Sequence, residues 1–214
     1  MLNQLPVLLV SIFINSAIGL ASTSIKPEPL GVVLVVTAWN YPFSTGLPPM
    51  VSAIAAGNSV VVKPSEMAPY SSKAFKKLVE KYMKPEFYRV IEGKVEVAKA
   101  VSKLPFDMIC FTGSTVTGRL VAIEAAKNLT PCIMELGGKC PIIVDETAEM
   151  DVSAFRVLFG KFVNSGQTCI GADHVFVHES VKEKFVKVVL EKAEEMYGNG
   201  QNIEDNGSVG KIIN

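Results

Sequence analysis

The feature that most constrains the fold is an alternation of short apolar runs with helical patterns between residues 32 and 135. Val32–Val36 and Ser59–Lys63 are rich in β-branched residues and are typical of buried strands. Ser71–Lys81 has helical apolar spacing and opens on a serine suited to cap it. Further strands are predicted at Tyr88–Glu92, Met108–Phe111 and Pro131–Glu135, and further helices at Pro49–Ala56, Val95–Leu104 and Val116–Lys127. Because alternating strands and helices pair their strands in parallel, the sequence predicts an α/β fold with a doubly wound parallel sheet.

The periodicity restarts after Gly137-Gly138. Two strands and two helices are predicted in this second stretch, at Pro141–Val144, Asp151–Val163, His174–Val177 and Val181–Tyr197. We therefore expect a domain boundary near Glu135–Lys139. Residues 26–135 would form the first domain, and residues 136–214 the first part of a second α/β domain.

Three residues that lie far apart in the chain offer the parts of a covalent mechanism on a carbonyl group. Cys169 ends the run GQTC and would attack as a thiolate, Glu135 in ELGGK would act as a general base, and Asn40 in WNYPF would donate to an oxyanion. Each residue also has an ordinary structural interpretation. Cys169 would be a small buried hydrophobe, Glu135 a solvated strand end and Asn40 a turn-capping amide.

Ligands of open α/β sheets bind at the carboxyl ends of the strands, and two groups of residues fall at such ends. Lys63 and Glu66 follow the second strand, where they would bind ribose hydroxyls or form a surface ion pair. Thr112, Gly113 and Ser114 lead from a strand into a helix whose N-terminal N–H groups suit a pyrophosphate. This turn lacks the GxGxxG pattern, so a simple serine-capped helix is the alternative.

These residues stand in motifs through which the chain resembles the aldehyde dehydrogenase superfamily, most closely its class 3 branch. The resemblance covers about Lys26 to Asn214. The motifs occur in the family's order: WNYPF at 39–43, GNSVVVKPSE at 57–66, FTGSTVTG at 111–118, ELGGK at 135–139 and GQTC at 166–169. The resemblance implies a variant Rossmann domain and oxidation of an aldehyde to a carboxylic acid through a thiohemiacetal and a thioester on Cys169.

The resemblance also implies roles for the cofactor residues. NAD is the expected cofactor, with NADP as the alternative, because Glu66 would repel a 2′-phosphate and Lys63 would tolerate one. Trp39 would pack near the phosphates, Lys63 and Glu66 would bind the adenosine ribose, Thr112, Gly113 and Ser114 would support the dinucleotide, and Gly137 would pass beneath the nicotinamide. Gly137 would equally suit an ordinary interdomain turn.

The resemblance leaves the activity of this chain open. The family's later Glu-x-Phe-Gly-Pro segment has no counterpart in residues 170–214, so we expect an internal fragment with little turnover. A catalytically silent, truncated relative is the alternative function, and a cysteine hydrolase built on Gln167 and Cys169 is a remote third. The expected partners are a small aldehyde of unknown chain length and, for the full-length family, a second copy in a homodimer.

The apolar segment 1–22 fits three interpretations. It ends in small residues like a signal peptide but has no lysine or arginine at its start, so a signal or anchor, a buried apolar segment and a gene-model artefact compete. A membrane is an expected partner only if this segment is a real anchor. Without it, we expect a cytoplasmic enzyme core.

Composition excludes other classes of function. The formal net charge is zero, and the lysine clusters are interspersed with acidic residues, so no nucleic-acid partner is expected. The four cysteines show no CxxC pairing, so no disulfide framework is expected. The two histidines, His174 and His178, are expected to share one face of a strand in a structural role, without a metal.

Overall fold

The computed structural model describes residues 26–198 and 209–213. Its larger sheet has five strands in the order β3-β2-β1-β4-β5, and every neighbouring pair is parallel. The strands are β1 (Val32–Val36), β2 (Ser59–Lys63), β3 (Tyr88–Val90), β4 (Met108–Gly113) and β5 (Cys132–Leu136). Leu34, Val60 and Ile109 are fully buried, as expected for central strands covered on both faces.

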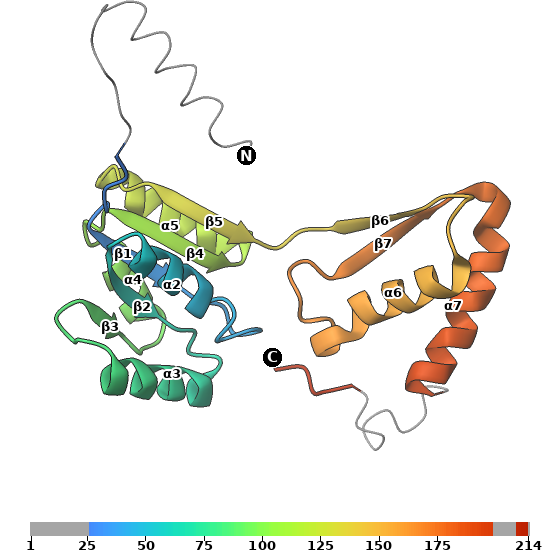
Figure 1. The fold of residues 1–214 in the computed structure, drawn as a ribbon, viewed down its shortest axis with the longest axis horizontal. Helices are drawn as coiled ribbons and strands as arrows, with labels where there is room; N and C mark the ends of the chain where they lie inside the picture. The colour runs from blue at the N-terminus through green and yellow to red at the C-terminus, as the bar shows by residue number, and fades with distance from the viewer. Residues whose placement is uncertain (1–25, 199–208, 214) are drawn as a thin grey trace, which may run out of the picture.

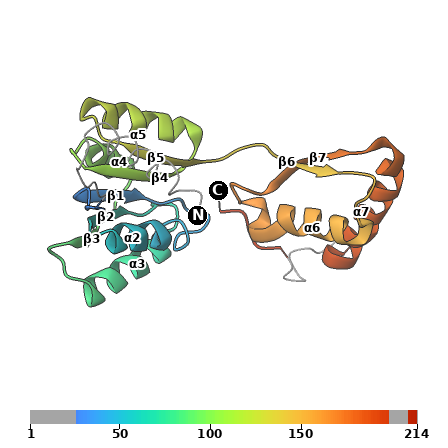
Figure 2. The same cartoon turned by 45° about the horizontal axis from the view of Figure 1, so that its top comes forward.

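Helices cover both faces of this sheet (Figure 2). On one face, α2 (Leu47–Ala55) and α3 (Pro69–Tyr82) place Met50, Phe75 and Val79 against β1 and β2. On the other face, α4 (Val95–Ser102) and α5 (Thr115–Lys127) contribute Val101, Val121 and Ala125 to a second core cluster. The predicted doubly wound parallel sheet is therefore confirmed.

A smaller unit follows β5 and extends away from the larger sheet (Figure 1). Its two strands, β6 (Cys140–Val144) and β7 (Ala172–Val177), are parallel. Helix α6 (Met150–Phe162) connects them, and α7 (Lys182–Tyr197) packs beside α6. The core of this unit contains Val144, Met150, Ala154 and Phe185, and Leu158 of α6 is also buried. The opposite face of its sheet is open, because Ile143 is 79% exposed and Phe176 is 60% exposed.

Two local predictions were wrong. Helix α3 begins at Pro69 instead of Ser71, because the fixed φ of proline suits the first helical position. No side chain caps it, since the N-cap residue is Ala68, which has no side-chain acceptor. His178 does not share a strand face with His174, since β7 ends at Val177. Instead, the His178 side chain caps the 3-10 helix η3 (Glu179–Val181) by accepting from the Ser180 N–H.

The apolar segment 1–22 lies outside the described residues, and the predicted division at 135/136 stays a prediction. Among the helices of the described ranges, none is both long and apolar enough to span a membrane. All four cysteines are free.

Candidate active site

The carboxyl ends of β1, β4 and β5 open into one cavity of about 430 Å³. Residues from both units line it, and they include all three predicted catalytic side chains, Asn40, Glu135 and Cys169. The other lining residues are Ala38, Trp39, Thr112, Gly113, Ser114, Thr115, Gly137, Gly138, Gln167 and Thr168. The cavity lies where open α/β sheets bind ligands.

Asn40 links the loop after β1 to the loop that carries Cys169. Its Nδ2 donates to the Gln167 carbonyl at 2.8 Å, across 127 residues of sequence. In return, Asn164 Nδ2 donates to the Asn40 carbonyl at 2.9 Å, and the Tyr41 and Thr168 hydroxyls are 2.8 Å apart. An amide nitrogen carries two N–H groups, so Asn40 can hold the loop and still donate to a ligand.

The backbone before Cys169 has an unusual conformation. In the 3-10 segment η2 (Val163–Gly166), Asn164, Ser165 and Gly166 have positive φ angles of 53°, 57° and 75°. Left-handed residues other than glycine cost free energy and persist where surrounding contacts hold them. Those contacts include the Asn164 side chain and a 2.9 Å hydrogen bond from Gln167 Nε2 to the Asn164 carbonyl. The strained turn leads into the exposed turn that holds Cys169.

Glu135 lies on β5 opposite Thr112 of β4, and it is exposed at the cavity wall. Its charge reaches the neighbouring strand. Burial, and secondarily the negative charge of Glu135, raises the pKa of the Cys110 thiol above its ordinary value. Burial also raises the pKa of Cys132. These two strand cysteines are therefore poor candidates for a thiolate nucleophile.

Lys63 and Glu66 form a close pair but do not line the cavity that contains Cys169. Lys63 is only 2% exposed, and its ammonium lies 2.7 Å from Glu66 Oε2 and 2.8 Å from the Pro64 carbonyl. Partial burial would raise the pKa of Glu66, but the hydrogen bond and positive charge of Lys63 outweigh it and lower this pKa below its ordinary value. Lys63 pairs with Val36 in the sheet register, so this ion pair lies beside the loop that follows β1.

The turn from β4 into α5 has the predicted form. Ser114 is the N-cap, and its Oγ accepts from the Thr117 N–H at 3.2 Å. A side chain at Gly113 would place its Cβ 2.6 Å from the Phe111 ring. The close contact between the backbone at position 113 and this ring therefore requires glycine. At Gly137 and Gly138 a Cβ would meet nothing within 4 Å, so packing does not explain these glycines. Open space there leaves room for a ligand.

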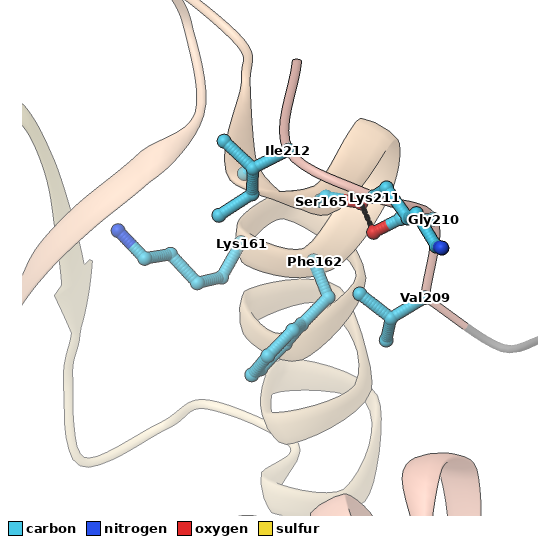
Figure 3. Close-up of a pocket in the computed structure, with 8 residues that line it drawn as sticks. Lys161, Phe162, Ser165, Val209, Gly210, Lys211 and Ile212 are labelled. Atoms are coloured by element: carbon cyan, nitrogen blue, oxygen red, sulfur yellow. Dashed lines mark hydrogen bonds between the residues drawn. The ribbon is translucent and has the colours of Figure 1, made fainter. Parts of the chain in front are cut away.

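Sequence patterns did not indicate two further cavities. One, of about 710 Å³, lies between the end of α6 and residues 209–212, with Phe162, Val209 and Ile212 around it (Figure 3). Ser165 Oγ donates to the Gly210 carbonyl at 2.6 Å at its edge. The other, of about 360 Å³, is a groove between α4 and α5. The apolar side chains of Val209 and Ile212 are the only sequence feature that could have indicated the first cavity, and no sequence feature indicated the groove.

The described residues that line the cavity include no histidine. Neither His174 nor His178 is among the lining residues, which disfavours a cysteine hydrolase with a histidine base. Within the described ranges, no cluster of three or more histidine, cysteine or acidic side chains could hold a metal ion.

Comparison with known proteins identifies the family. The sequence model described as "Aldehyde dehydrogenase family" matches residues 14–214. The chain belongs to this family. It is 43% identical to the 4,4'-diaponeurosporen-aldehyde dehydrogenase of Staphylococcus aureus, over 89% of this chain and 41% of that protein. It is 44% identical to the dimeric NADP-preferring aldehyde dehydrogenase of Mus musculus, over 89% of this chain and 42% of that protein.

Solved aldehyde dehydrogenases have the same fold. The substrate-bound state of Staphylococcus aureus AldH aligns with a TM-score of 0.83 at 43% identity, over 89% of this chain and 41% of that one. A Mycobacterium tuberculosis aldehyde dehydrogenase complexed with NAD+ aligns with a TM-score of 0.78 at 29% identity, over 87% and 39%. The chain thus spans about two fifths of the length of these aldehyde dehydrogenases.

Proposed function

We propose that this chain carries the nucleophile, the base and much of the cofactor site of an NAD(P)-dependent aldehyde dehydrogenase that forms carboxylic acids. The observation that carries the proposal is the meeting of Asn40, Glu135 and Cys169 at one cavity, together with the N-terminus of α5. Family membership supports the same reaction class. A catalytically silent relative is the alternative, and it would give neither acylation of Cys169 nor reduced cofactor.

In the proposed reaction, the Cys169 thiolate attacks the aldehyde carbon and forms a thiohemiacetal. The Asn40 side-chain N–H and the Cys169 backbone N–H would stabilise its oxyanion. The hydrogen bond from Asn40 to Gln167 fits this role, because it fixes the amide beside the nucleophile loop. A bound nicotinamide cofactor would supply a hydride acceptor, so that a thioester remains on Cys169.

Glu135 would then complete the reaction by taking a proton from water. Its exposed position at the cavity wall gives it access to that water. Hydrolysis of the thioester would release the carboxylic acid and restore the thiol.

The residues around the cavity fit a dinucleotide. Ser114 caps α5, and the other N–H groups of the first helical turn are free to donate to a ligand. The N-terminus of a helix carries a partial positive charge and therefore favours an anion such as a pyrophosphate. The open space at Gly137 and Gly138 suits a ring that needs close backbone approach. Trp39, Thr112 and Gly113 line the same cavity and would pack beside the phosphates.

Lys63 and Glu66 would bind the adenosine ribose beside that cavity. An ammonium has three N–H donors, two of which already bond to Glu66 and Pro64, and each carboxylate oxygen can accept from a hydroxyl. The lowered pKa of Glu66 keeps it ionised at neutral pH, which disfavours a 2′-phosphate. We therefore propose NAD as the preferred cofactor and NADP as a weaker one.

A trapping experiment tests this function without requiring full turnover. The Glu135→Gln variant, incubated with NAD and a medium-chain aldehyde, should accumulate an acyl group on Cys169 and one equivalent of reduced cofactor. Peptide mass spectrometry locates the acyl group, and the matched Cys132→Ser variant in the same background should acylate equally. Acylation at another cysteine, or none at Cys169 when NAD is bound, would contradict the proposed mechanism.

A further inference from the structure

A second thiol lies beside the proposed nucleophile. Cys140, the first residue of β6, places its Sγ 3.4 Å from the carbonyl oxygen of Cys169 and 3.9 Å from that of Gly138. Since a carbonyl oxygen lies about 2.4 Å from its own Cα, Cys140 Sγ is within about 6 Å of the Cys169 Cα. The Cα of Cys140 lies about 2.8 Å from its own Sγ, so the two Cα atoms are at most about 9 Å apart. A disulfide needs Cα atoms about 4.4–6.8 Å apart, so rotation about χ1, together with a small shift of the turn that holds Cys169 where the separation exceeds this range, brings the sulfurs together.

The local backbone leaves room for that rotation. Cys169 is exposed, and Cys140 is partly exposed at the end of its strand. The β6–β7 register shifts between Cys140 and Pro141, so the pairing beside Cys140 is irregular. The other two cysteines offer no such partner: Cys110 and Cys132 project to opposite faces of the larger sheet, because they pack in different core clusters.

We infer that Cys140 is a resolving thiol that captures oxidised Cys169 as an intramolecular disulfide. Hydrogen peroxide is the oxidant. The Cys169 thiolate attacks one peroxide oxygen, the O–O bond breaks, and Cys169 sulfenic acid and hydroxide form. The Cys140 thiolate then attacks the Cys169 sulfur, the S–O bond breaks, and the oxygen leaves as water with the proton that Cys140 gave up. Two electrons pass from the two thiols to the peroxide.

This modification would protect the site while switching it off. The disulfide directs Cys169 Sγ toward β6 and away from an aldehyde, and it blocks oxidation to the sulfinic acid, which dithiols do not reverse. A dithiol reductant would restore both thiols. The inference rests on the proposed function only in taking Cys169 as the reactive thiol.

Tryptic peptides allow a direct test, because cleavage after lysine and arginine puts each cysteine in a separate peptide. They are residues 104–119, 128–139, 140–156 and 162–182. The purified chain is treated with limiting peroxide, its free thiols are alkylated, and it is digested without reduction. The expected product is peptide 140–156 joined to peptide 162–182, two hydrogen atoms lighter than the separate peptides. On a non-reducing gel the protein should migrate as a monomer.

Variants separate a resolving role from chance oxidation. Cys140→Ser keeps a hydroxyl donor for the Cys169 carbonyl, so the fold should persist, but the cross-linked peptide should vanish. After dithiothreitol, recovery of free Cys169 thiol should fall on the order of tenfold relative to the unmodified chain, because Cys169 is over-oxidised. The matched Cys132→Ser variant should keep the cross-link and the recovery.

Different measurements would refute the resolving role of Cys140 and the proposed enzyme function. If Cys169 is oxidised to the sulfinic acid while Cys140 remains alkylated, the resolving role is refuted, and acylation of Cys169 by aldehyde and NAD still tests the enzyme independently. If peroxide joins Cys140 or Cys169 to Cys110 or Cys132, then Cys140 is not the thiol that reaches Cys169, and the inference is refuted. If Cys169 reacts with neither peroxide nor aldehyde, both proposals fail.

Discussion

Glu66→Gln tests whether the buried ammonium of Lys63 depends on its carboxylate partner. The Lys63 side chain is 3% exposed and that of Glu66 is 38% exposed, at a separation of 2.7 Å. At an effective dielectric constant of about 20, the attraction is about 6 kcal/mol, but most of it offsets the cost of removing Lys63 from water. Glutamine keeps an oxygen acceptor, and the Pro64 carbonyl remains. We therefore expect the free energy of unfolding to fall by about 1–2 kcal/mol.

The loss should depend on pH in a defined direction. The pKa of Glu66 is lowered in the folded chain from its ordinary value of 4.5, so the charged pair stabilises the fold fully above pH 4.5. As the pH falls through the folded-state pKa, the carboxylate is protonated and this stabilisation is lost. The difference between the original chain and Glu66→Gln should accordingly shrink toward zero in acid.

Urea unfolding measures both effects, followed by fluorescence of Trp39, the only tryptophan, and by circular dichroism. The matched control is Glu80→Gln, which removes the exposed Lys76–Glu80 pair of α3, at 3.3 Å with side chains 36% and 58% exposed. That change should cost no more than about 0.5 kcal/mol. Equal losses for the two variants, or a Glu66→Gln deficit that stays constant into acid, would refute the reasoning.

The remaining predictions concern the proposed chemistry and apply to a protein preparation that shows measurable turnover. Cys169→Ala should abolish turnover, whereas Glu135→Gln should give a burst of reduced cofactor and then stall; a normal steady-state rate for either variant would exclude the assigned roles. Asn40→Ala should lower the acylation rate on the order of 10²–10³-fold, measured by rapid mixing, if the amide donates to the oxyanion; a loss below about threefold would leave Asn40 a loop contact only. Glu66→Gln should weaken NAD more than NADP in calorimetric titrations, and an unchanged preference would argue that Glu66 does not contact the ribose.

The sequence predicted the elements of the larger sheet well because each strand is a short apolar run between turn residues. Observed strand ends differ from the predicted ones by a few residues at most, as at β3, which ends at Val90 instead of Glu92. The predicted start of α3 was wrong because Ser71 and Pro69 both suit a helix N-terminus, and only three-dimensional packing decides between them. The capping role of His178 depends on where β7 ends, which its apolar pattern does not fix.

The candidate site was only partly predictable from the sequence. Strand ends and motifs indicated Cys169, Glu135 and Asn40, and these residues line one cavity. The contacts that bring them together were not predictable, because the Asn40–Gln167 and Asn164–Asn40 hydrogen bonds join loops more than 120 residues apart. No local pattern encodes such pairs. The proximity of Cys140 to Cys169 has the same origin, since it depends on the pairing of β6 with β7.

The position of Cys169 relative to Glu135 therefore depends on two connections with different physical properties. One is the short connector 137–139 between β5 and β6, whose glycines are not confined by packing. The other is the set of hydrogen bonds that Asn40 and Tyr41 form with the loop that carries Cys169, where Asn164 and Ser165 hold strained backbone angles. Near-attack geometry is lost with displacements of about 1 Å, and a glycine connector alone does not restrict motion to that range. The hydrogen bonds of Asn40 and Tyr41 are thus the contacts that position the proposed nucleophile, Cys169, and Asn40 joins this positioning to its proposed role as an oxyanion donor.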